Sequence, residues 1–388
     1  MLSRRLAATA DCIDKMEISR KKKNGVGHAI ISLSDASAFS NPIENSQGKV
    51  ITQTGSEAMT TLRKDARLSP ALKQNGNTTE VLSDTIEHLQ LTTGLAQSAL
   101  ILRTGLGLVF VIGGLMKLSM LLNPATKALI LQQYLGPLGY INESFHQYLF
   151  FEGSWLTPAL FLTTLSGFEL LSGGALILGL WVRPLSLFYG FLLWTFVIAL
   201  PTHTVPELVP EVETYRSPAM LIQIRDIALS GMMFVLFNIG AGKASLDQRW
   251  FPHTQPSHWQ ELGLLLRFSM AIVFIVAGFF SEFDHIPSFS CPPWLLAIIG
   301  LALIFGNSPV VRSAAAVAMA VMLWFMASKF SIDLSIIANL NGFKREFALG
   351  AAAVVLMLQG GGNAFTLADI AIRCHDYWAC SFTAAKDR

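Results

Sequence analysis

The sequence predicts an all-α integral membrane protein, with two tandem four-helix transmembrane bundles after a mostly disordered N-terminal segment. Three observations lead to this fold class. Hydrophobic residues make up 52% of the chain and charged residues only 14%, whereas soluble domains carry about a quarter charged residues. From residue 99 onward the chain is a series of apolar runs, several near the length of about 20 residues that crosses a bilayer. The second half of this series also repeats features of the first.

The N-terminal region is expected to contain two parts. Residues 1–76 are rich in Ser, Thr, Asn, Gly and Lys and poor in aromatic residues, so they bury too little apolar surface to offset the entropy of ordering. We therefore expect this part to be largely disordered. Over 77–98, residues such as Val81, Leu82 and Ile86 recur at helical spacing, which predicts an amphipathic helix at the membrane surface.

Eight transmembrane helices are expected after this region, because backbone groups inside a bilayer must be hydrogen-bonded within their own segment. Their predicted bounds are 99–121, 156–180, 185–202, 221–240, 261–281, 293–306, 310–328 and 346–360. The first four spans form a unit over 99–250 and the next four a second, degenerate unit over 251–370. Residues 371–388 are a C-terminal tail.

The two units are related by matching residues at equal offsets along the chain. The matches include Arg103 with Arg267, Phe110 with Phe274, Arg225-Asp226 with Arg345-Glu346, and Gly240 with Gly360. Agreement at both ends of a unit predicts a parallel internal repeat, since each unit has an even number of spans. The basic N-terminal segment is expected on the cytoplasmic side under the positive-inside rule, which places both termini there.

Charged residues inside a bilayer are costly and usually face a bundle interior or a water-filled cavity. The candidate catalytic residues are Glu169, Lys117, Arg225 and Asp226. Glu169 lies near the middle of the second span, and either Arg225 or Lys117 is its closest partner in expected depth. This group predicts a polar pocket suited to an anionic substrate or to protonation beside a quinone ring. The alternative is a set of buried ion pairs that only specify helix packing.

Four further residues are candidates for binding a substrate or quinone: Arg103, Arg183, His203 and Trp194. His203 lies at the outer end of the third span, where an imidazole can exchange protons near neutral pH; the alternative is an interfacial residue without a role. No metal site is expected, because the four cysteines form no Cys-x-x-Cys pair and no metal-ligand spacing. No covalently bound cofactor is evident, and the net charge of +2 does not indicate a nucleic-acid partner.

The second unit lacks part of this charged set. Ser281 stands where Lys117 aligns, and no acidic residue stands where Glu169 aligns. If these charges served packing alone, both units would tend to keep them. We therefore expect the first unit alone to hold the polar cavity and any chemistry, and the second unit to be structural.

Residues 99–250 resemble the DoxX/DoxD family of four-span bacterial membrane proteins. The matching stretches are 103–117, 168–184, 225–229 and 240–247. The long loop after the first span is more similar to the DoxD branch, the small subunit of thiosulfate:quinone oxidoreductase. Two features depart from this pattern: the N-terminal extension, and a second DoxX-like bundle where a different subunit is sometimes fused.

The resemblance implies a location in the bacterial inner membrane, with the lipid bilayer, a quinone and a second subunit or larger membrane complex as partners. Two functions stay open at this point. The first is a membrane subunit of a quinone-linked oxidoreductase, similar to thiosulfate:quinone oxidoreductase. The second is a non-enzymatic membrane scaffold or assembly subunit of a larger complex. A small-solute transporter is less favoured, because broken helices at matching positions are not evident.

Overall fold

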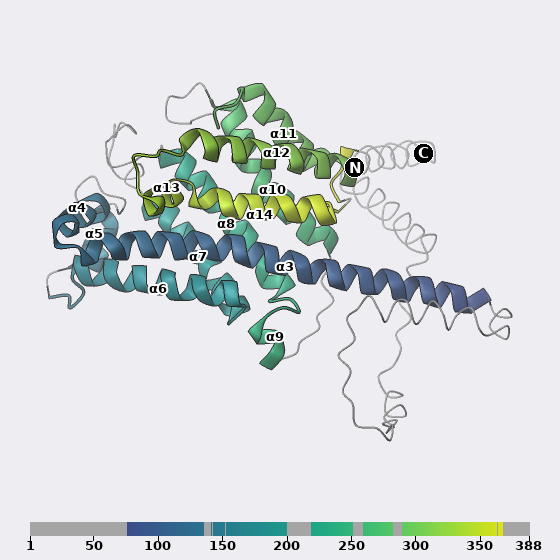
Figure 1. Cartoon of the computed structure of the whole chain (residues 1–388), viewed down its shortest axis with the longest axis horizontal. Coiled ribbons are helices and arrows are strands. Elements are labelled where there is room, and N and C mark those ends of the chain that lie inside the picture. The colour runs from purple at the N-terminus through teal and green to yellow at the C-terminus, as the bar shows by residue number, and fades with distance from the viewer. Residues whose placement is uncertain are drawn as a thin grey trace, which may run out of the picture. The chain divides into compact units, whose positions relative to one another are not determined.

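The computed structural model describes residues 76–135, 141, 143–151, 153–199, 219–250, 259–281, 289–362 and 364–367. Within these ranges every regular element is an α-helix (Figure 1). The helices are α3 (Gly76–Leu122), α4 (Pro124–Leu135), α5 (Glu143–Leu149), α6 (Pro158–Leu178), α7 (Val182–Ala199), α8 (Ala219–Ile239), α9 (Leu246–Trp250), α10 (Trp259–Phe279), α11 (Pro293–Phe305), α12 (Ser308–Lys329), α13 (Ile336–Gly342) and α14 (Lys344–Gln359).

A helix lies at each of the eight positions predicted for a span. The prediction that residues 77–98 form a separate helix is wrong, because this segment and the first span form one continuous helix, the 47-residue α3. The apolar pattern also did not predict the short helices α4 and α5 after the first span, α9 after α8, or α13 before α14. The predictions for 1–75, for the tail over 371–388 and for His203 concern residues outside the described part.

Five of the described helical segments are long and apolar enough to cross a membrane. They are Thr93–Leu122, Pro158–Leu178, Val182–Ala199, Trp259–Phe279 and Ser308–Lys329. The apolar helix α11 has only 13 residues, so at about 1.5 Å per residue it is about 20 Å long, shorter than a hydrocarbon core of about 30 Å. The chain is therefore a multi-pass membrane protein.

Local signals set the ends of α6 and α12 in the same way. Thr157 precedes α6 and its hydroxyl accepts a hydrogen bond from the Leu160 amide at 3.3 Å. Asn307 precedes α12 and its side-chain oxygen accepts from the Val310 amide at 3.3 Å. A proline follows each cap, where its missing amide costs no helical hydrogen bond. Gly179 ends α6 in the left-handed conformation that favours glycine.

Glycines allow α3 and α6 to pack backbone against backbone. A Cβ on Gly173 would lie 2.8 Å from both the Gly107 carbonyl oxygen and the Val111 amide nitrogen, and one on Gly114 would lie 2.6 Å from the Ser166 carbonyl oxygen. The second half repeats this contact between α10 and α11, where a Cβ on Gly300 would lie 2.9 Å from the Ile275 amide nitrogen. Small residues at such contacts let membrane helices approach closely.

We expect Gly173→Ala to lower the stability of the protein by about 1–3 kcal/mol, because the new methyl group would overlap the backbone of α3. The adjacent Gly174 is a matched control, since nothing lies within 4 Å of the position of its Cβ. Thermal unfolding of the two variants in the same detergent measures the difference. Equal unfolding midpoints for both variants would contradict the described α3–α6 contact.

The two halves also end in the same way. The Arg103 guanidinium donates hydrogen bonds to the carbonyl oxygens of Ala241, at 2.9 Å, and of Ala244. The Arg267 guanidinium of the second half donates to Gly306, at 2.9 Å, and to Ala364. Each arginine is buried and connects the first helix of its half to the chain beyond the last helix. The contacts with Ala244 and Ala364 lie at matching positions of the predicted repeat, whereas Gly306 lies at the end of α11.

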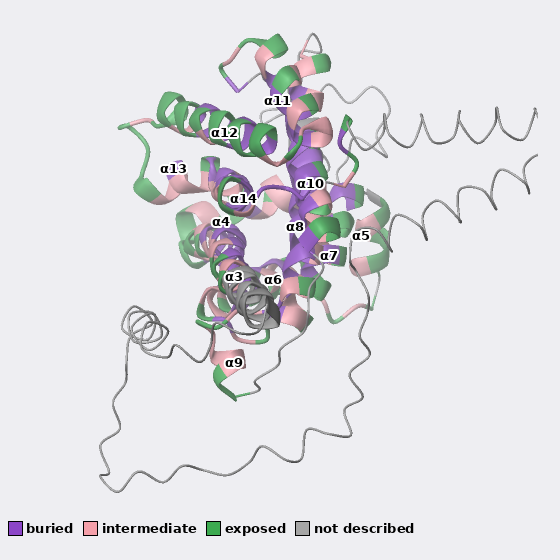
Figure 2. Cartoon of the chain, turned by 90° about the vertical axis from the view of Figure 1, so that its right-hand side faces the viewer, coloured by how far each residue is buried: buried purple, intermediate pink, exposed green. Residues whose placement is uncertain are grey.

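Residues 91–371 form one compact unit, so the two predicted bundles are packed together and do not stand apart. Helices α8 and α14 are buried along most of their described length, and α8 and α10 lie side by side near the centre of this unit (Figure 2). They contact each other closely, because a Cβ on Gly231 of α8 would overlap the Ser269 hydroxyl of α10. The core of the unit thus runs across the junction of the two halves.

Candidate functional site

A cavity of about 310 Å³ lies among α3, α4, α6, α7, α8, α13 and α14. Most of its wall is apolar, with side chains that include Val109, Phe110, Met116, Met120, Leu162, Leu165, Leu193 and Phe196. Its polar lining residues are Lys117, Gln133, Tyr134, Glu169, Arg225, Asp226, Asn341, Lys344 and Arg345. The sequence predicts a cavity within the first half alone. The structure differs, because α13 and α14 of the second half also line the cavity.

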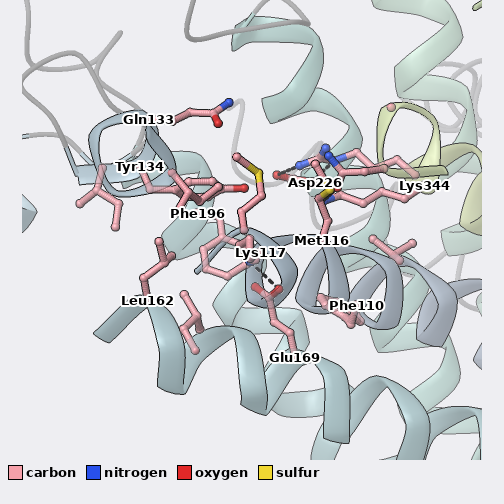
Figure 3. A pocket seen from close by; sticks show the side chains of 18 of the residues that line it. Phe110, Met116, Lys117, Gln133, Tyr134, Leu162, Glu169, Phe196, Asp226 and Lys344 are labelled. Carbon is pink, nitrogen blue, oxygen red and sulfur yellow. Dashed lines mark hydrogen bonds and ion pairs between the residues drawn. The ribbon is translucent and has the colours of Figure 1, made fainter. Parts of the chain in front are cut away.

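The centre of the site is an ion pair between Lys117 and Glu169 (Figure 3). Lys117 Nζ lies 2.5 Å from Glu169 Oε2, and the side chains are only 8% and 5% exposed. The pairing follows from depth, since both residues lie at the same level of the packed helices α3 and α6. A buried ion pair is costly to desolvate unless its geometry is close, so the short contact fits two groups that are charged together.

Helix α4 covers this pair from the loop side, as Figure 3 shows for Tyr134 and Gln133. The Lys117 ammonium lies 5.6 Å from the centroid of the Tyr134 ring, which is within the range of a cation–π contact. Burial raises the pKa of the Tyr134 hydroxyl, and the Glu169 carboxylate adds to the rise. The phenol therefore stays protonated and is a hydrogen-bond donor over the cavity.

The two halves exchange ion pairs beside the cavity. Arg345 of α14 binds Asp226 of α8 through two contacts, Nε to Oδ1 at 2.6 Å and Nη2 to Oδ2 at 3.1 Å. Arg225 of α8 in turn lies 3.1 Å from Glu346 of α14, Nη1 to Oε1. These are the matching residues of the predicted repeat, so each half contributes the same pair to the other. Reciprocal contacts of this kind are typical of a two-fold related interface.

The corresponding position in the second half is filled by aromatic side chains. The Arg225 guanidinium lies 5.5 Å from the centroid of the Phe289 ring and 5.7 Å from that of Phe325. Phe289 also stacks on Phe274, the residue that matches Phe110 of the first half. Arg345, which matches Arg225, faces the open cavity. The two halves therefore differ at this level. Aromatic rings of the second half fill the space beside Arg225, whereas the space beside Arg345 in the first half is a cavity.

Lys344 is the second lysine of the cavity and comes from the start of α14. Its ammonium donates a hydrogen bond to Asn341 Oδ1 at 3.0 Å. A Cβ on Gly113 would lie 3.0 Å from Lys344 Nζ and 3.6 Å from Glu169 Oε2, so the absence of a side chain at Gly113 leaves room for both groups. The Glu169 carboxylate and the Lys344 ammonium, which come from different halves, thus both lie next to Gly113.

The structure separates the eight predicted site residues. Lys117, Glu169, Arg225 and Asp226 line the cavity together. Arg103 does not, because it lies four helical turns from Lys117, about 21 Å along α3, and binds the carbonyl groups beyond α8. The remaining candidates are placed as follows: Arg183 lies near Gly240 at the same end as Arg103, Trp194 is 43% exposed on α7 and does not line the cavity, and His203 is outside the described residues.

The sequence reasoning missed the contribution of Lys344, Arg345 and Asn341 to the site. A signal was available in the repeat itself. Since Arg225-Asp226 and Arg345-Glu346 match, a two-fold arrangement of the halves brings both pairs to one level beside the cavity. Among the described residues, no group of three or more His, Cys, Asp or Glu side chains gathers at a position that could hold a metal ion.

These features define a class: a multi-pass, all-helical membrane protein with a buried, charged cavity at the junction of its two halves. Residues 98–203 match the family model described as DoxX. The matched range begins within α3 and includes α6 and α7, so it contains Lys117 and Glu169 but not the cavity residues of α8, α13 and α14. Searches of curated proteins and of solved structures give no match.

Proposed function

We propose that this protein is a membrane subunit of a quinone-linked oxidoreductase, and that its cavity holds the ring of a membrane quinone. The observation that carries the proposal is the buried Lys117–Glu169 pair at one side of a largely apolar cavity. A quinone ring needs both kinds of surface, because its carbon skeleton is apolar and its ring oxygens accept hydrogen bonds. When bound, a quinone supplies the capacity to accept two electrons and two protons.

The dimensions and lining residues of the cavity fit a substituted ring. A cavity of about 310 Å³ lies at the lower end of the range of about 300–1,000 Å³ for small-molecule sites. Phe110 and Phe196 supply aromatic faces, which favour offset stacking with another ring. The thioethers of Met116 and Met120 adapt to the outline of a ligand.

The polar residues take separate roles in this proposal. The Lys117 ammonium donates a hydrogen bond to a ring oxygen, and Glu169 keeps the lysine oriented and exchanges a proton with it. The Tyr134 hydroxyl, protonated because its pKa is raised, is a second donor from the covering helix. Electrons come from a partner subunit or from a reduced sulfur substrate, as in the thiosulfate:quinone oxidoreductase that the first half resembles.

The two halves are proposed to be a DoxX-like unit and a degenerate copy of it, with eight spans in all. The repeated glycine contacts of α6 and α11, and the matching contacts of Arg103 with Ala244 and of Arg267 with Ala364, support a duplication. The basic residues Arg183 and Lys243 lie near the Arg103 end of the molecule, which supports a cytoplasmic location for that end under the positive-inside rule. The cavity then faces the outer half of the bacterial inner membrane.

A pair of tryptophan substitutions on α6 tests the proposal. Leu165 lines the cavity, whereas Leu171 is 76% exposed on the outer face of the same helix. The full-length protein, purified with its native lipids, is expected to bind 2-methoxy-1,4-naphthoquinone in equilibrium dialysis. Leu165→Trp should fill the cavity and weaken this binding at least about tenfold, the loss of about 1.4 kcal/mol, and Leu171→Trp should leave it unchanged.

The same preparation distinguishes the alternative function. A protein that binds no quinone, and whose native complex reduces none with thiosulfate as donor, would overturn the oxidoreductase proposal and favour the non-enzymatic scaffold. Equal binding by the two tryptophan variants would show that any quinone binds outside the cavity.

A further inference from the structure

The charges around the cavity do not balance. Among the described residues, the cavity and the ion pairs beside it contain four basic side chains, Lys117, Lys344, Arg225 and Arg345, and three carboxylates, Glu169, Asp226 and Glu346. Each carboxylate forms an ion pair with a different cation. Glu169 pairs with Lys117, Asp226 with Arg345 and Glu346 with Arg225. Lys344 is left without a carboxylate and instead donates to the neutral Asn341 side chain.

An ammonium group that faces an apolar cavity without a counter-ion is unfavourable, because the low local dielectric strengthens every uncompensated charge. Burial, together with the nearby charges of Arg345 and Lys117, lowers the pKa of Lys344 to about 7. The lysine is therefore only partly charged at neutral pH, and a bound anion would restore its charge. The Lys344 position is held by the fold. It begins α14, and the next two residues, Arg345 and Glu346, are both anchored to α8 by ion pairs. The lysine therefore cannot easily withdraw from the cavity, and a bound group with one negative charge would complete the balance.

We propose that the cavity binds its ring ligand as an oxyanion, a ring with one ionised oxygen, and that Lys344 is the counter-ion. This inference rests on the proposed function, which supplies the ring. The apolar wall and the volume of about 310 Å³ favour an aromatic or quinonoid anion over a small inorganic one, since a small hydrated anion would leave the phenylalanine and methionine side chains against water. The second half thus determines which form of the ligand the first half binds.

The position of Glu169 supports the same assignment. It lies near Lys344 across Gly113 but is paired with Lys117, so one lysine neutralises the protein carboxylate and the other is free for the ligand. Figure 3 shows Lys344 and Lys117 approaching the cavity from different helices, with Glu169 below them. A ring between the two lysines would therefore contact one paired and one uncompensated ammonium group.

Two naphthoquinones that differ in charge test this inference by equilibrium dialysis with the full-length protein. The probe 2-hydroxy-1,4-naphthoquinone is an anion at neutral pH, and 2-methoxy-1,4-naphthoquinone is its neutral analogue of similar size. The wild-type protein is expected to bind the anion at least about tenfold more tightly, as charge-assisted hydrogen bonds permit. Lys344→Met should reduce this preference to less than about twofold while the neutral probe keeps its affinity, and Lys344→Arg should retain the preference.

Lys127 on the exposed surface of α4 is the matched control, since Lys127→Met removes one positive charge outside the cavity and should retain the preference. Lys344→Met is expected to fold, because no carboxylate loses its partner. Equal affinity of the wild-type protein for both probes would overturn the inference and leave quinone binding intact, as would a preference that survives in Lys344→Met. Failure to bind either probe would overturn the proposed function as well.

Discussion

Lys117→Met is expected to destabilise the protein by about 3–5 kcal/mol, the usual cost of breaking a buried ion pair. The substitution leaves the Glu169 carboxylate, which is 5% exposed, without the ammonium group that lies 2.5 Å away. Lys344 forms no ion pair with Glu169 in the described structure and donates to Asn341 Oδ1 instead. Thermal unfolding in a fixed detergent, followed by circular dichroism, measures the change, and Lys127→Met on the exposed surface of α4 is the control.

The double variant Lys117→Met/Glu169→Leu separates stability from ligand binding. Replacing both members of a buried pair by apolar residues of similar size is often neutral or stabilising, so we expect the unfolding midpoint to return close to that of the wild-type protein. Quinone binding should stay at least about tenfold weaker, because the hydrogen-bond donor is gone. A double variant that binds quinone normally would assign the pair to packing, the alternative that the sequence left open.

Asp226→Asn is expected to have the second largest effect, a loss of about 3 kcal/mol or more. Asp226 accepts both contacts of Arg345 across the junction of the halves, and the neutral amide cannot balance a guanidinium group that is only 22% exposed. Because Arg345 precedes the anchored Glu346 and follows Lys344, the change should also disturb the start of α14 and weaken anion binding. The unfolding midpoint and the affinity for 2-hydroxy-1,4-naphthoquinone measure the two effects.

The control for this prediction is Glu261→Gln, which removes an exposed carboxylate from the first turn of α10. Surface substitutions of this kind usually change stability by less than about 0.5 kcal/mol. If Asp226→Asn unfolds at the same temperature as Glu261→Gln, the two-contact pair between the halves does not hold them together. A lower midpoint with unchanged anion affinity would limit the role of Asp226 to stability.

The candidate site was partly predictable because helical geometry converts sequence position into depth. The positions of Lys117 and Glu169 along their helices put both at one level of the bundle, and the structure pairs them. The same geometry excludes Arg103 from that level, about 21 Å away along α3. Depth alone does not tell which way a side chain faces, and this is why Trp194 was a candidate although the neighbouring Leu193 and Phe196 line the cavity instead.

The sequence by itself determined the membrane class, the positions of the eight helices expected as spans and the matching residues of the two halves. These properties depend on local features: the length of an apolar run, a capping residue such as Thr157 or Asn307, and a left-handed glycine such as Gly179. Only the tertiary structure decided that α14 contributes Lys344 and Arg345 to a cavity beside Lys117 and Glu169. The physical reason is that contacts between residues more than a hundred positions apart depend on which helix faces pack together, and an apolar face can pack equally well against lipid or against another helix.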